Sequence, residues 1–153
     1  MPTDCISYQN SGYFSPLMND YLDEKSNLKS LYNRFPKIEN FEAQIAEKQT
    51  NFNNASRSKL VTILLEQYIG VPTSYLTQQN IESLKVENTF TVITGHQLNL
   101  FSGPLYFLYK IISTINLTKE LKAKYPASNF VPIYWMATED HDFEEINYFN
   151  FKG

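Results

Sequence analysis

Two short polar clusters carry the side chains of this sequence that are best suited to chemistry. The first cluster comprises Gly95, His96, Gln97, Ser102 and Gly103. The second comprises Glu139, Asp140, His141 and Asp142. A histidine can transfer a proton near neutral pH, and neighbouring carboxylates can polarise its ring or bind a cation. The two clusters together could therefore serve general acid and base catalysis.

Each cluster follows a stretch that favours a β-strand. Residues 90–93 are β-branched or apolar, and residues 130–137 form a second, largely apolar run. Between them, residues 104–124 carry apolar side chains at helical spacing, over so wide a face that the helix should be largely covered. This order predicts a right-handed βαβ unit with parallel strands. We therefore expect both clusters at the carboxyl edge of the sheet, where open α/β sheets bind ligands.

The turn after the first strand contains residues that favour a ligand loop. Gly95 is expected to adopt a backbone angle closed to other residues, and Gly103 to let the chain approach a ligand closely. Pro104 suits the first helical position, because the amide hydrogen that it lacks is not needed there. The free amides of that helix start would attract an anion. The turn matches no standard nucleotide-binding fingerprint, so an ordinary strand-to-helix connection stays open as an alternative.

The acidic cluster also has a purely structural interpretation. Acidic residues favour the first turn of a helix, so residues 139–142 could simply begin a helix after Thr138. A metal site is not predicted, because the local spacing offers only two ligands on one helix face. Cys5 is the only cysteine, which excludes an intrachain disulfide.

Composition limits the class of protein. The chain has 153 residues, of which 42% are hydrophobic and 15% aromatic, enough to bury a core. Its formal net charge of -3 and the lack of a Lys/Arg-rich face give no electrostatic case for nucleic acid or an anionic membrane surface. No apolar run approaches the roughly 20 residues of a membrane span. We expect a cytoplasmic protein.

Residues 1–88 are predicted to form a helical amino-terminal region. The first helix should enter at Pro16 and stop before Phe35. A second helix should cover residues 39–49, and a third, capped by Ser56, should end at Gly70. A short helix is expected around residues 81–84.

Residues 89–153 are predicted to be the first part of a Rossmann-like α/β core. Two strands do not make a stable sheet alone, and residues 147–151 offer at most one more. We therefore expect the chain to be a truncated piece of a larger domain, incomplete at Gly153.

Several of these segments together resemble the paired motifs of a known family. Residues 94–106, Tyr109 with Lys110, and residues 135–143 are similar to the motifs of the bacillithiol biosynthesis cysteine-adding enzymes. Residues 80–85 and the helical start resemble the amino-terminal region of that family, so the likeness covers nearly the whole chain. Many members carry Gln at the position of His96, which makes His141 the better candidate for proton transfer.

The resemblance implies a ligase with a Rossmann-like core and a helical coiled-coil appendage used in dimerisation. Such an enzyme would join the carboxyl group of cysteine to the amino group of glucosaminyl-malate, the last step towards bacillithiol, a low-molecular-weight thiol. This fragment alone is expected to be inactive. Two other classes stay open: another acyl-activating or nucleotidyl-transferring Rossmann enzyme, and a noncatalytic interaction domain.

Site roles follow from the motifs and the resemblance together. The expected catalytic residues are His141, Asp140, Asp142, Glu139 and His96. The expected substrate-binding residues are Gly95, Gln97, Ser102, Gly103, Tyr106 and Lys110. Lys110 and the helix start could hold the phosphate of an activated acyl group, which makes ATP a candidate cofactor.

Overall fold

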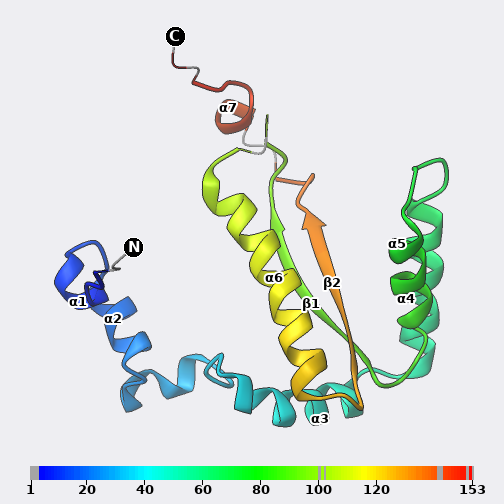
Figure 1. Cartoon of the computed structure of the whole chain (residues 1–153), viewed down its shortest axis with the longest axis horizontal. Coiled ribbons are helices and arrows are strands. Elements are labelled where there is room, and N and C mark those ends of the chain that lie inside the picture. The colour runs from blue at the N-terminus through cyan, green and yellow to red at the C-terminus, as the bar shows by residue number, and fades with distance from the viewer. Residues whose placement is uncertain (1–3, 100, 102, 141–142, 151, 153) are drawn as a thin grey trace. The chain divides into compact units, whose positions relative to one another are not determined.

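The structure, a computed structural model, describes residues 4–99, 101, 103–140, 143–150 and 152. The chain divides into two compact units, Met1–Gln44 and Ile45–Gly153. The second unit contains a two-stranded parallel sheet and the helices around it (Figure 1). None of the helices among the described residues combines the length and apolar character that crossing a membrane requires.

The first unit consists of short helical segments rather than one long helix. They are α1 (Tyr8–Ser11), α2 (Pro16–Leu22) and the 3-10 helices η1 (Ser26–Leu31) and η2 (Ile38–Asn40). Ser15 caps α2 by accepting a hydrogen bond from the Met18 amide, as its sequence context predicts. The prediction of one helix from Pro16 to just before Phe35 was wrong, because α2 ends at Leu22. Glu24 has a φ of 53°, a left-handed angle that ends the right-handed helix.

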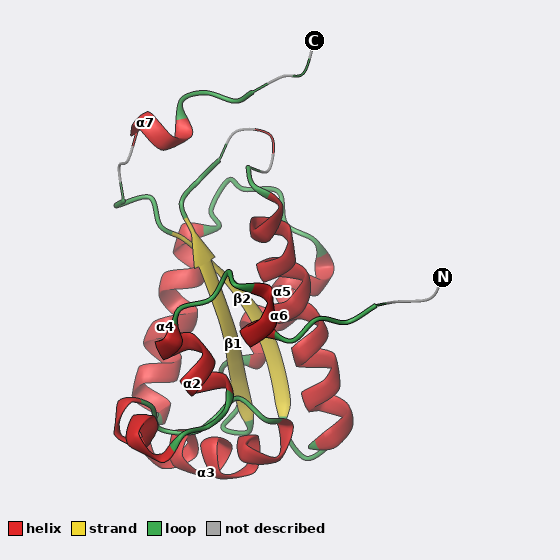
Figure 2. Cartoon of the chain, turned by 90° about the vertical axis from the view of Figure 1, so that its left-hand side faces the viewer, coloured by secondary structure: helices red, strands yellow, loops and turns green. Residues whose placement is uncertain are grey.

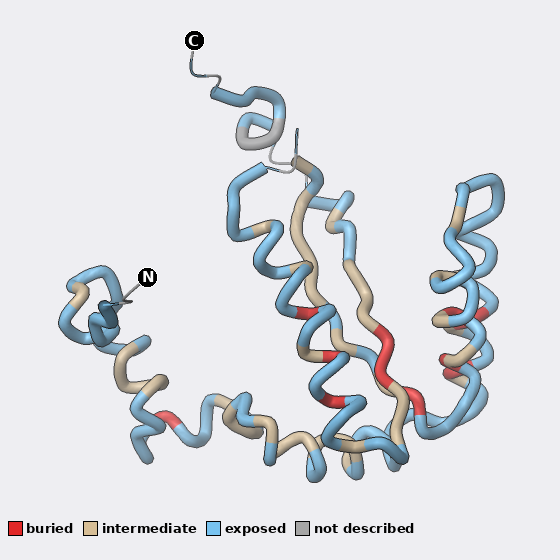
Figure 3. The backbone as a smooth tube through the Cα atoms, viewed as in Figure 1, coloured by how far each residue is buried: buried red, intermediate tan, exposed pale blue. Residues whose placement is uncertain are grey.

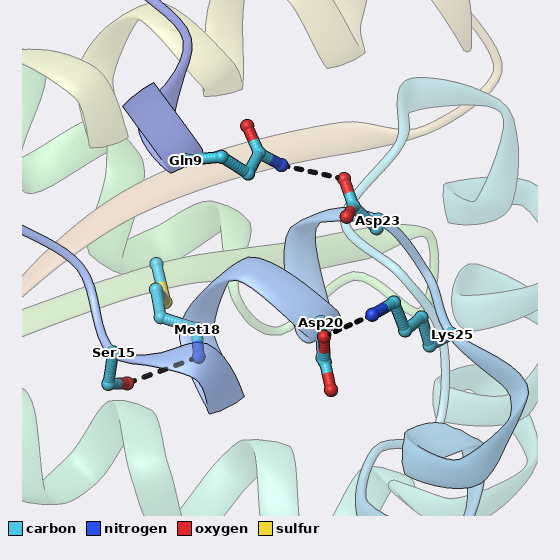
Figure 4. A network of polar contacts seen from close by, with 6 residues as sticks. All are labelled: Gln9, Ser15, Met18, Asp20, Asp23 and Lys25. Atoms are coloured by element: carbon cyan, nitrogen blue, oxygen red, sulfur yellow. Dashed lines mark hydrogen bonds and ion pairs between the residues drawn. The ribbon is translucent and has the colours of Figure 1, made fainter. Parts of the chain in front are cut away.

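Exposed polar contacts close the turn that follows α2. The Gln9 amide donates to the Asp23 carboxylate at 2.9 Å, and the Lys25 ammonium donates to Asp20 (Figure 4). This hydrogen bond and the charge of Asp20 raise the pKa of Lys25 above its ordinary value. Because the Lys25 side chain is exposed and the Asp20 side chain is partly exposed, this ion pair adds little to stability.

Three further helices lead to the sheet. They are α3 (Phe41–Asn51), α4 (Asn54–Gln67) and α5 (Tyr75–Ser83), so the predicted helices in this region are present. The predicted cap of α4 was wrong, because Asn53 rather than Ser56 lies at that position. The Asn53 side chain accepts from the Ser56 amide at 2.9 Å.

The predicted βαβ unit is confirmed. Strands β1 (Thr89–His96) and β2 (Asn129–Met136) pair in parallel, and α6 (Leu105–Lys124) connects them (Figure 2). Gly95 and His96, expected in the turn, belong to β1 itself. The possible third strand at residues 147–151 was wrong for its described part, because residues 147–150 form no strand and follow the short α7 (Phe143–Ile146).

The core of the second unit lies between β2 and the pair α4–α5. Val61, Ile81, Leu84 and Val131 form this cluster, with Ile133 packed against it. On the other face α6 packs on both strands. The buried positions of α6 lie along its side toward the sheet (Figure 3).

Arg57 of α4 anchors the segment that leads into β1. The residue is 3% exposed, and its guanidinium donates to the carbonyl oxygens of Leu84, Glu87 and Thr89 at 3.2, 2.9 and 2.9 Å. These carbonyls would otherwise lack donors in a buried place. The side chain thus fixes where β1 begins.

The outer side of α6 is more exposed than its sequence predicts. We expected the wide apolar face of this helix to be largely covered, and that expectation was wrong for the side that points away from the sheet. Leu105 is 65% exposed, Tyr109 61% and Ile112 52%. The two strands are too narrow a sheet to cover so wide a helix face.

Candidate functional site

The first polar cluster lies where β1 ends. Gly95 pairs with Trp135 of β2 in the sheet register. A Cβ atom at Gly95 would lie 3.0 Å from both the Cβ atom and the carbonyl oxygen of Trp135. The closeness of Trp135 on the neighbouring strand therefore leaves no room for a side chain at position 95. The expected special backbone angle is not found there.

Gly103, rather than Gly95, has the left-handed backbone angle, with a φ of 58°. A Cβ atom on Gly103 would lie 2.5 Å from the Cβ atom of Asn99, so the chain here approaches Asn99. Pro104 is the residue before the helix instead of its first residue, and it provides no side-chain cap. No side chain at this cap therefore accepts hydrogen bonds from the first amides of α6. Amides without such an acceptor are what an anion site needs.

The ring of His96 is held from both of its nitrogens. Nε2 lies 2.7 Å from the hydroxyl oxygen of Tyr106, and Nδ1 lies 3.0 Å from the carbonyl oxygen of Gln97. The Asn99 amide nitrogen is also 3.0 Å from Nδ1 and donates to the Gln97 carbonyl oxygen at 3.0 Å. His96 is thus oriented by the loop and by the first turn of α6.

Two successive carbonyl groups at the end of β1 are bound by side chains. The Lys110 ammonium donates to the carbonyl oxygen of Gly95 at 2.7 Å, and the Tyr134 hydroxyl donates to that of His96 at 3.0 Å. The same ammonium lies 5.9 Å from the ring centre of Tyr106. Lys110 is exposed and keeps two further hydrogens for other acceptors.

Phe107 connects the two strand ends through ring contacts. Its ring centre lies 5.8 Å from that of His96 and 5.5 Å from that of Tyr134. Partial burial raises the pKa of Tyr134 above its ordinary value. Sequence reasoning missed Asn99, Phe107 and Tyr134 as parts of this site. The alternation of side chains along β2 could have indicated that Tyr134 lies on the same face as Phe130.

The second cluster is only partly described. Glu139 accepts a hydrogen bond from the Trp135 indole at 3.3 Å, and the Asp140 amide donates to the Ala137 carbonyl oxygen at 3.3 Å. Both acidic residues are exposed and lie before α7, so neither belongs to a helical first turn. His141, Asp142 and Ser102, which carry much of the prediction, lie outside the described residues.

The described parts of the two clusters lie at the same edge of the sheet. His96 and Met136 are register partners at the ends of parallel strands, and Glu139 follows three residues later. Across residues 4–99, 101, 103–140, 143–150 and 152, no polar contact joins Glu139 or Asp140 to His96. No three His, Cys, Asp or Glu side chains among those residues could hold a metal ion together. The proposed pairing of the clusters stays a prediction.

An open depression of about 450 Å³ lies between β1 and α6. Residues 92–94 form its strand side, and Tyr106, Tyr109, Lys110 and Ser113 contribute to its helix side. Lys110 is the only cation in this lining among the described residues. The depression thus offers an ammonium, hydroxyl groups and an aromatic surface, which suit a small anionic ligand.

Comparisons with known proteins identify relatives of the whole chain. The model of the amino-terminal Rossmann-like domain of bacillithiol biosynthesis BshC matches residues 1–153. The proteins named "Putative cysteine ligase BshC" from Flavobacterium johnsoniae and Flavobacterium psychrophilum are 74% and 70% identical over 100% of this chain. The protein of the same name from Christiangramia forsetii is 63% identical over 100% of it. The chain spans 29%, 29% and 28% of the lengths of these curated relatives.

Proposed function

This chain belongs to the bacillithiol biosynthesis BshC family through the amino-terminal Rossmann-like domain, and we propose that it provides part of the active site of a cysteine ligase. The whole protein would join the carboxyl group of cysteine to the amino group of glucosaminyl-malate in the last step towards bacillithiol. The name of the relatives supports a cysteine ligase. The named acceptor and the place in the pathway are part of the proposal.

The observation that carries the proposal is the convergence of Lys110, Tyr106 and His96 at the end of β1. Lys110 and Tyr106 extend from the first turns of α6, and the ring of His96 lies within 2.7 Å of the Tyr106 hydroxyl. A cation beside a helix start favours a carboxylate or phosphate group. This is where an open α/β sheet binds ligands.

Amide formation from a free carboxylate requires an activated acyl group, because the carboxylate oxygen is a poor leaving group. ATP is the candidate cofactor, and it would supply the phosphoryl group that turns this oxygen into a good leaving group. The residues present fit such a group, since Lys110 is exposed and α6 begins without a side-chain cap. Lys110 would bind the phosphate oxygens and stabilise the charge that develops as the amine attacks.

The remaining site residues receive orienting and proton-transfer roles. Gly95 and Gly103 would shape the substrate site by letting Trp135 and Asn99 pack closely against the backbone, and Gln97 would donate a hydrogen bond. His141 would accept the proton that the attacking ammonium must lose, with Glu139, Asp140 and Asp142 holding the ring or the sugar. Ser102 would bind the substrate. His96 would orient Tyr106 through their 2.7 Å hydrogen bond.

Two properties of the whole protein belong to the same proposal. The enzyme would lie in the cytoplasm. It would form a homodimer through a helical appendage, which would lie in the part of the whole protein that this chain does not cover. The 153-residue chain alone would bind ligands weakly and would not turn over, because less than a third of the relatives' length is present.

The experiment uses a protein that begins with this sequence and has the full length of the relatives, which we call the family-length protein. It is incubated with cysteine and glucosaminyl-malate, with and without ATP, and bacillithiol is measured by mass spectrometry. Thermal unfolding with each ligand is measured in parallel, because a ligand that binds the native state raises the unfolding temperature. Product formation supports the proposal. Stabilisation by cysteine without product from this acceptor would favour another acyl-activating enzyme, and no response to any ligand would favour an interaction domain.

A further inference from the structure

Two hydrogen bonds that flank the sheet show which backbone groups point away from it. The Asn129 amide donates to the Asn88 carbonyl oxygen at 2.8 Å, and the Ala137 amide donates to that of His96 at 3.2 Å. In a parallel pair, alternate residues of each strand bond to the partner strand. With the observed register, the even-numbered residues of β1 therefore face β2, and its odd-numbered residues face outward. On β2 the even-numbered residues face outward.

The outward groups of β1 are bound at its two ends and open between them. Thr89 accepts from Arg57 and Gly95 accepts from Lys110, both through carbonyl oxygens on the outer edge. Between these ends, no described residue bonds to the amide or carbonyl of Thr91 or Ile93, or to the Gly95 amide. Thr91 and Ile93 are also exposed, Ile93 by 59%. β1 thus presents an unbroken row of donors and acceptors.

The outer edge of β2 lacks such a row. Pro132 lies at the middle of this strand on an outward-facing position, and proline has no amide hydrogen to donate. Proline in a strand is tolerated where its nitrogen faces away from a partner strand, which is the situation at a sheet edge. The sequence of β2 thus fits an edge strand, whereas that of β1 fits a strand with neighbours on both sides.

Side chains around β1 are consistent with a missing neighbour. The pair α4–α5 packs on Val131 and Ile133 of β2 but leaves Ile93 exposed. The depression of about 450 Å³ runs beside residues 92–94, and Tyr109 on its other wall is 61% exposed. A strand placed along β1 would cover both side chains. The relatives offer such a segment, because this chain spans only 29% of their length.

We propose that the outer edge of β1, residues 91–95, binds a further β-strand from the rest of the family-length polypeptide, and that β2 is the edge strand of the completed sheet. The connection through α6 leads from β1 to β2 on one side, whereas the added strand would lie on the other side of β1. Open α/β sheets bind ligands where the strand order reverses in this way. The ligand crevice would lie between β1 and the added strand, beside Lys110, rather than between β1 and β2. This assignment does not depend on the cysteine ligase reaction.

Amide hydrogen exchange tests the proposal at individual residues. The 153-residue chain is compared with a chimaera in which this sequence is followed by the rest of the Flavobacterium johnsoniae relative, and NMR follows each amide. The outward amides of Thr91, Ile93 and Gly95 should exchange quickly in the short chain and become slower by about 100-fold or more in the long one. The outward amides of Tyr134 and Met136 form the matched set on β2 and should stay fast in both.

The amides of Val92 and Thr94 face β2 and serve as the internal reference in both proteins. Slowing at Tyr134 and Met136 in the long protein would overturn the proposal, because β2 would then have a second neighbour. Unchanged exchange at Thr91 and Ile93 would also overturn it. Slowing in the short chain that increases with protein concentration would mean that a second copy, and not the rest of the polypeptide, occupies the edge.

Discussion

Asn99 Nδ2 lies 3.0 Å from His96 Nδ1, so an amide donor faces one nitrogen of the imidazole ring. The amide has two hydrogens and can donate the other to the Gln97 carbonyl oxygen, which is also 3.0 Å away. If Nδ1 accepts, the ring proton must be on Nε2, where it points to the Tyr106 hydroxyl oxygen. This arrangement leaves the Tyr106 hydrogen free to donate to a ligand.

The relationship predicts that Asn99 sets the tautomer of His96. In the wild-type chain the neutral ring should carry its hydrogen on Nε2, whereas in Asn99→Asp the carboxylate should draw the hydrogen to Nδ1. Long-range nitrogen–proton NMR correlations distinguish the two tautomers. A wild-type ring with its hydrogen on Nδ1 would mean that the Gln97 carbonyl controls the ring instead. Asn99→Ala, which has neither group, should give a mixture.

Lys110 should matter for activity far more than for stability. In the family-length enzyme, Lys110→Met should lower kcat/KM by about 100-fold, because the proposed charge contact of the ammonium with the anionic group of the substrate is lost. Stability should change by less than about 1 kcal/mol, since the ammonium is exposed and bonds to one carbonyl oxygen. Lys119→Met, at another exposed position of α6, is the matched control and should leave both quantities unchanged. Equal activities of the two variants would remove Lys110 from the site.

Tyr134 should make the protein lose stability at high pH. Its pKa is raised in the folded state by burial, so the unfolded chain, whose tyrosine ionises near pH 10.0, releases the proton first. The unfolded state then binds fewer protons, and the free energy of unfolding falls as pH rises above 10 toward the folded-state pKa. Ionisation would also remove the hydrogen that Tyr134 donates to His96.

Tyr134→Phe should therefore weaken the dependence of stability on pH above 10. Denaturant unfolding at several pH values measures it, and the tyrosinate absorbance difference between wild type and variant reports the ionisation of this residue. Tyr13→Phe is the control, because Tyr13 is 91% exposed. An identical alkaline loss in wild type and Tyr134→Phe would contradict the prediction.

Arg57 should be among the residues most important for stability. Arg57→Met would leave the carbonyl oxygens of Leu84, Glu87 and Thr89 without their donor in a largely buried place. We expect the free energy of unfolding to fall by about 3 kcal/mol. Lys59→Met changes an exposed side chain of the same helix and should stay within about 0.5 kcal/mol of wild type. A similar value for both variants would show that the carbonyls find water instead.

The sequence predicts the βαβ unit well because its signals are strong and local. The structure has strands β1 and β2 at the apolar runs of residues 90–93 and 130–137. Helix α6 covers the helical spacing between them. The end of α2 before Glu24 could not be predicted, because Glu24 has a left-handed backbone angle that glutamate residues rarely adopt. The cap of α4 was ambiguous for another reason: Asn53, Asn54 and Ser56 can all act as caps.

The sequence indicated candidate residues for a site but not their contacts, and the role of these residues in a site stays a prediction. His96 lies at the end of β1, and Tyr106 and Lys110 lie in the first turns of α6, on either side of the predicted strand-to-helix turn. Tyr134 could not be found by motif, because its role comes from the side-chain alternation of β2 and from its approach to the strand end. The exposed face of α6 could not be predicted either. The apolar pattern of a helix reflects everything that the helix packs against in the complete protein, and this chain spans only 29% of the length of its relatives.

The two histidines should differ in their importance for catalysis in the family-length enzyme. His141 has acidic neighbours on both sides in the sequence, which can hold and polarise its ring. His141→Ala should lower turnover by about 100-fold or more if this residue transfers a proton. The measurement is the rate of bacillithiol formation from glucosaminyl-malate and cysteine.

His96→Gln should have a mild effect on the same rate. Its ring bonds to Tyr106 and lies beside Gln97 and Asn99, so it acts through hydrogen bonds that a glutamine amide can replace in part. The resemblance noted from the sequence also allows Gln at this position. His96→Ala cannot make these bonds and should be worse than His96→Gln, which separates orientation from proton transfer. A severe loss in His96→Gln, together with full activity in His141→Ala, would exchange the two roles, because only the proton-transferring group needs an imidazole.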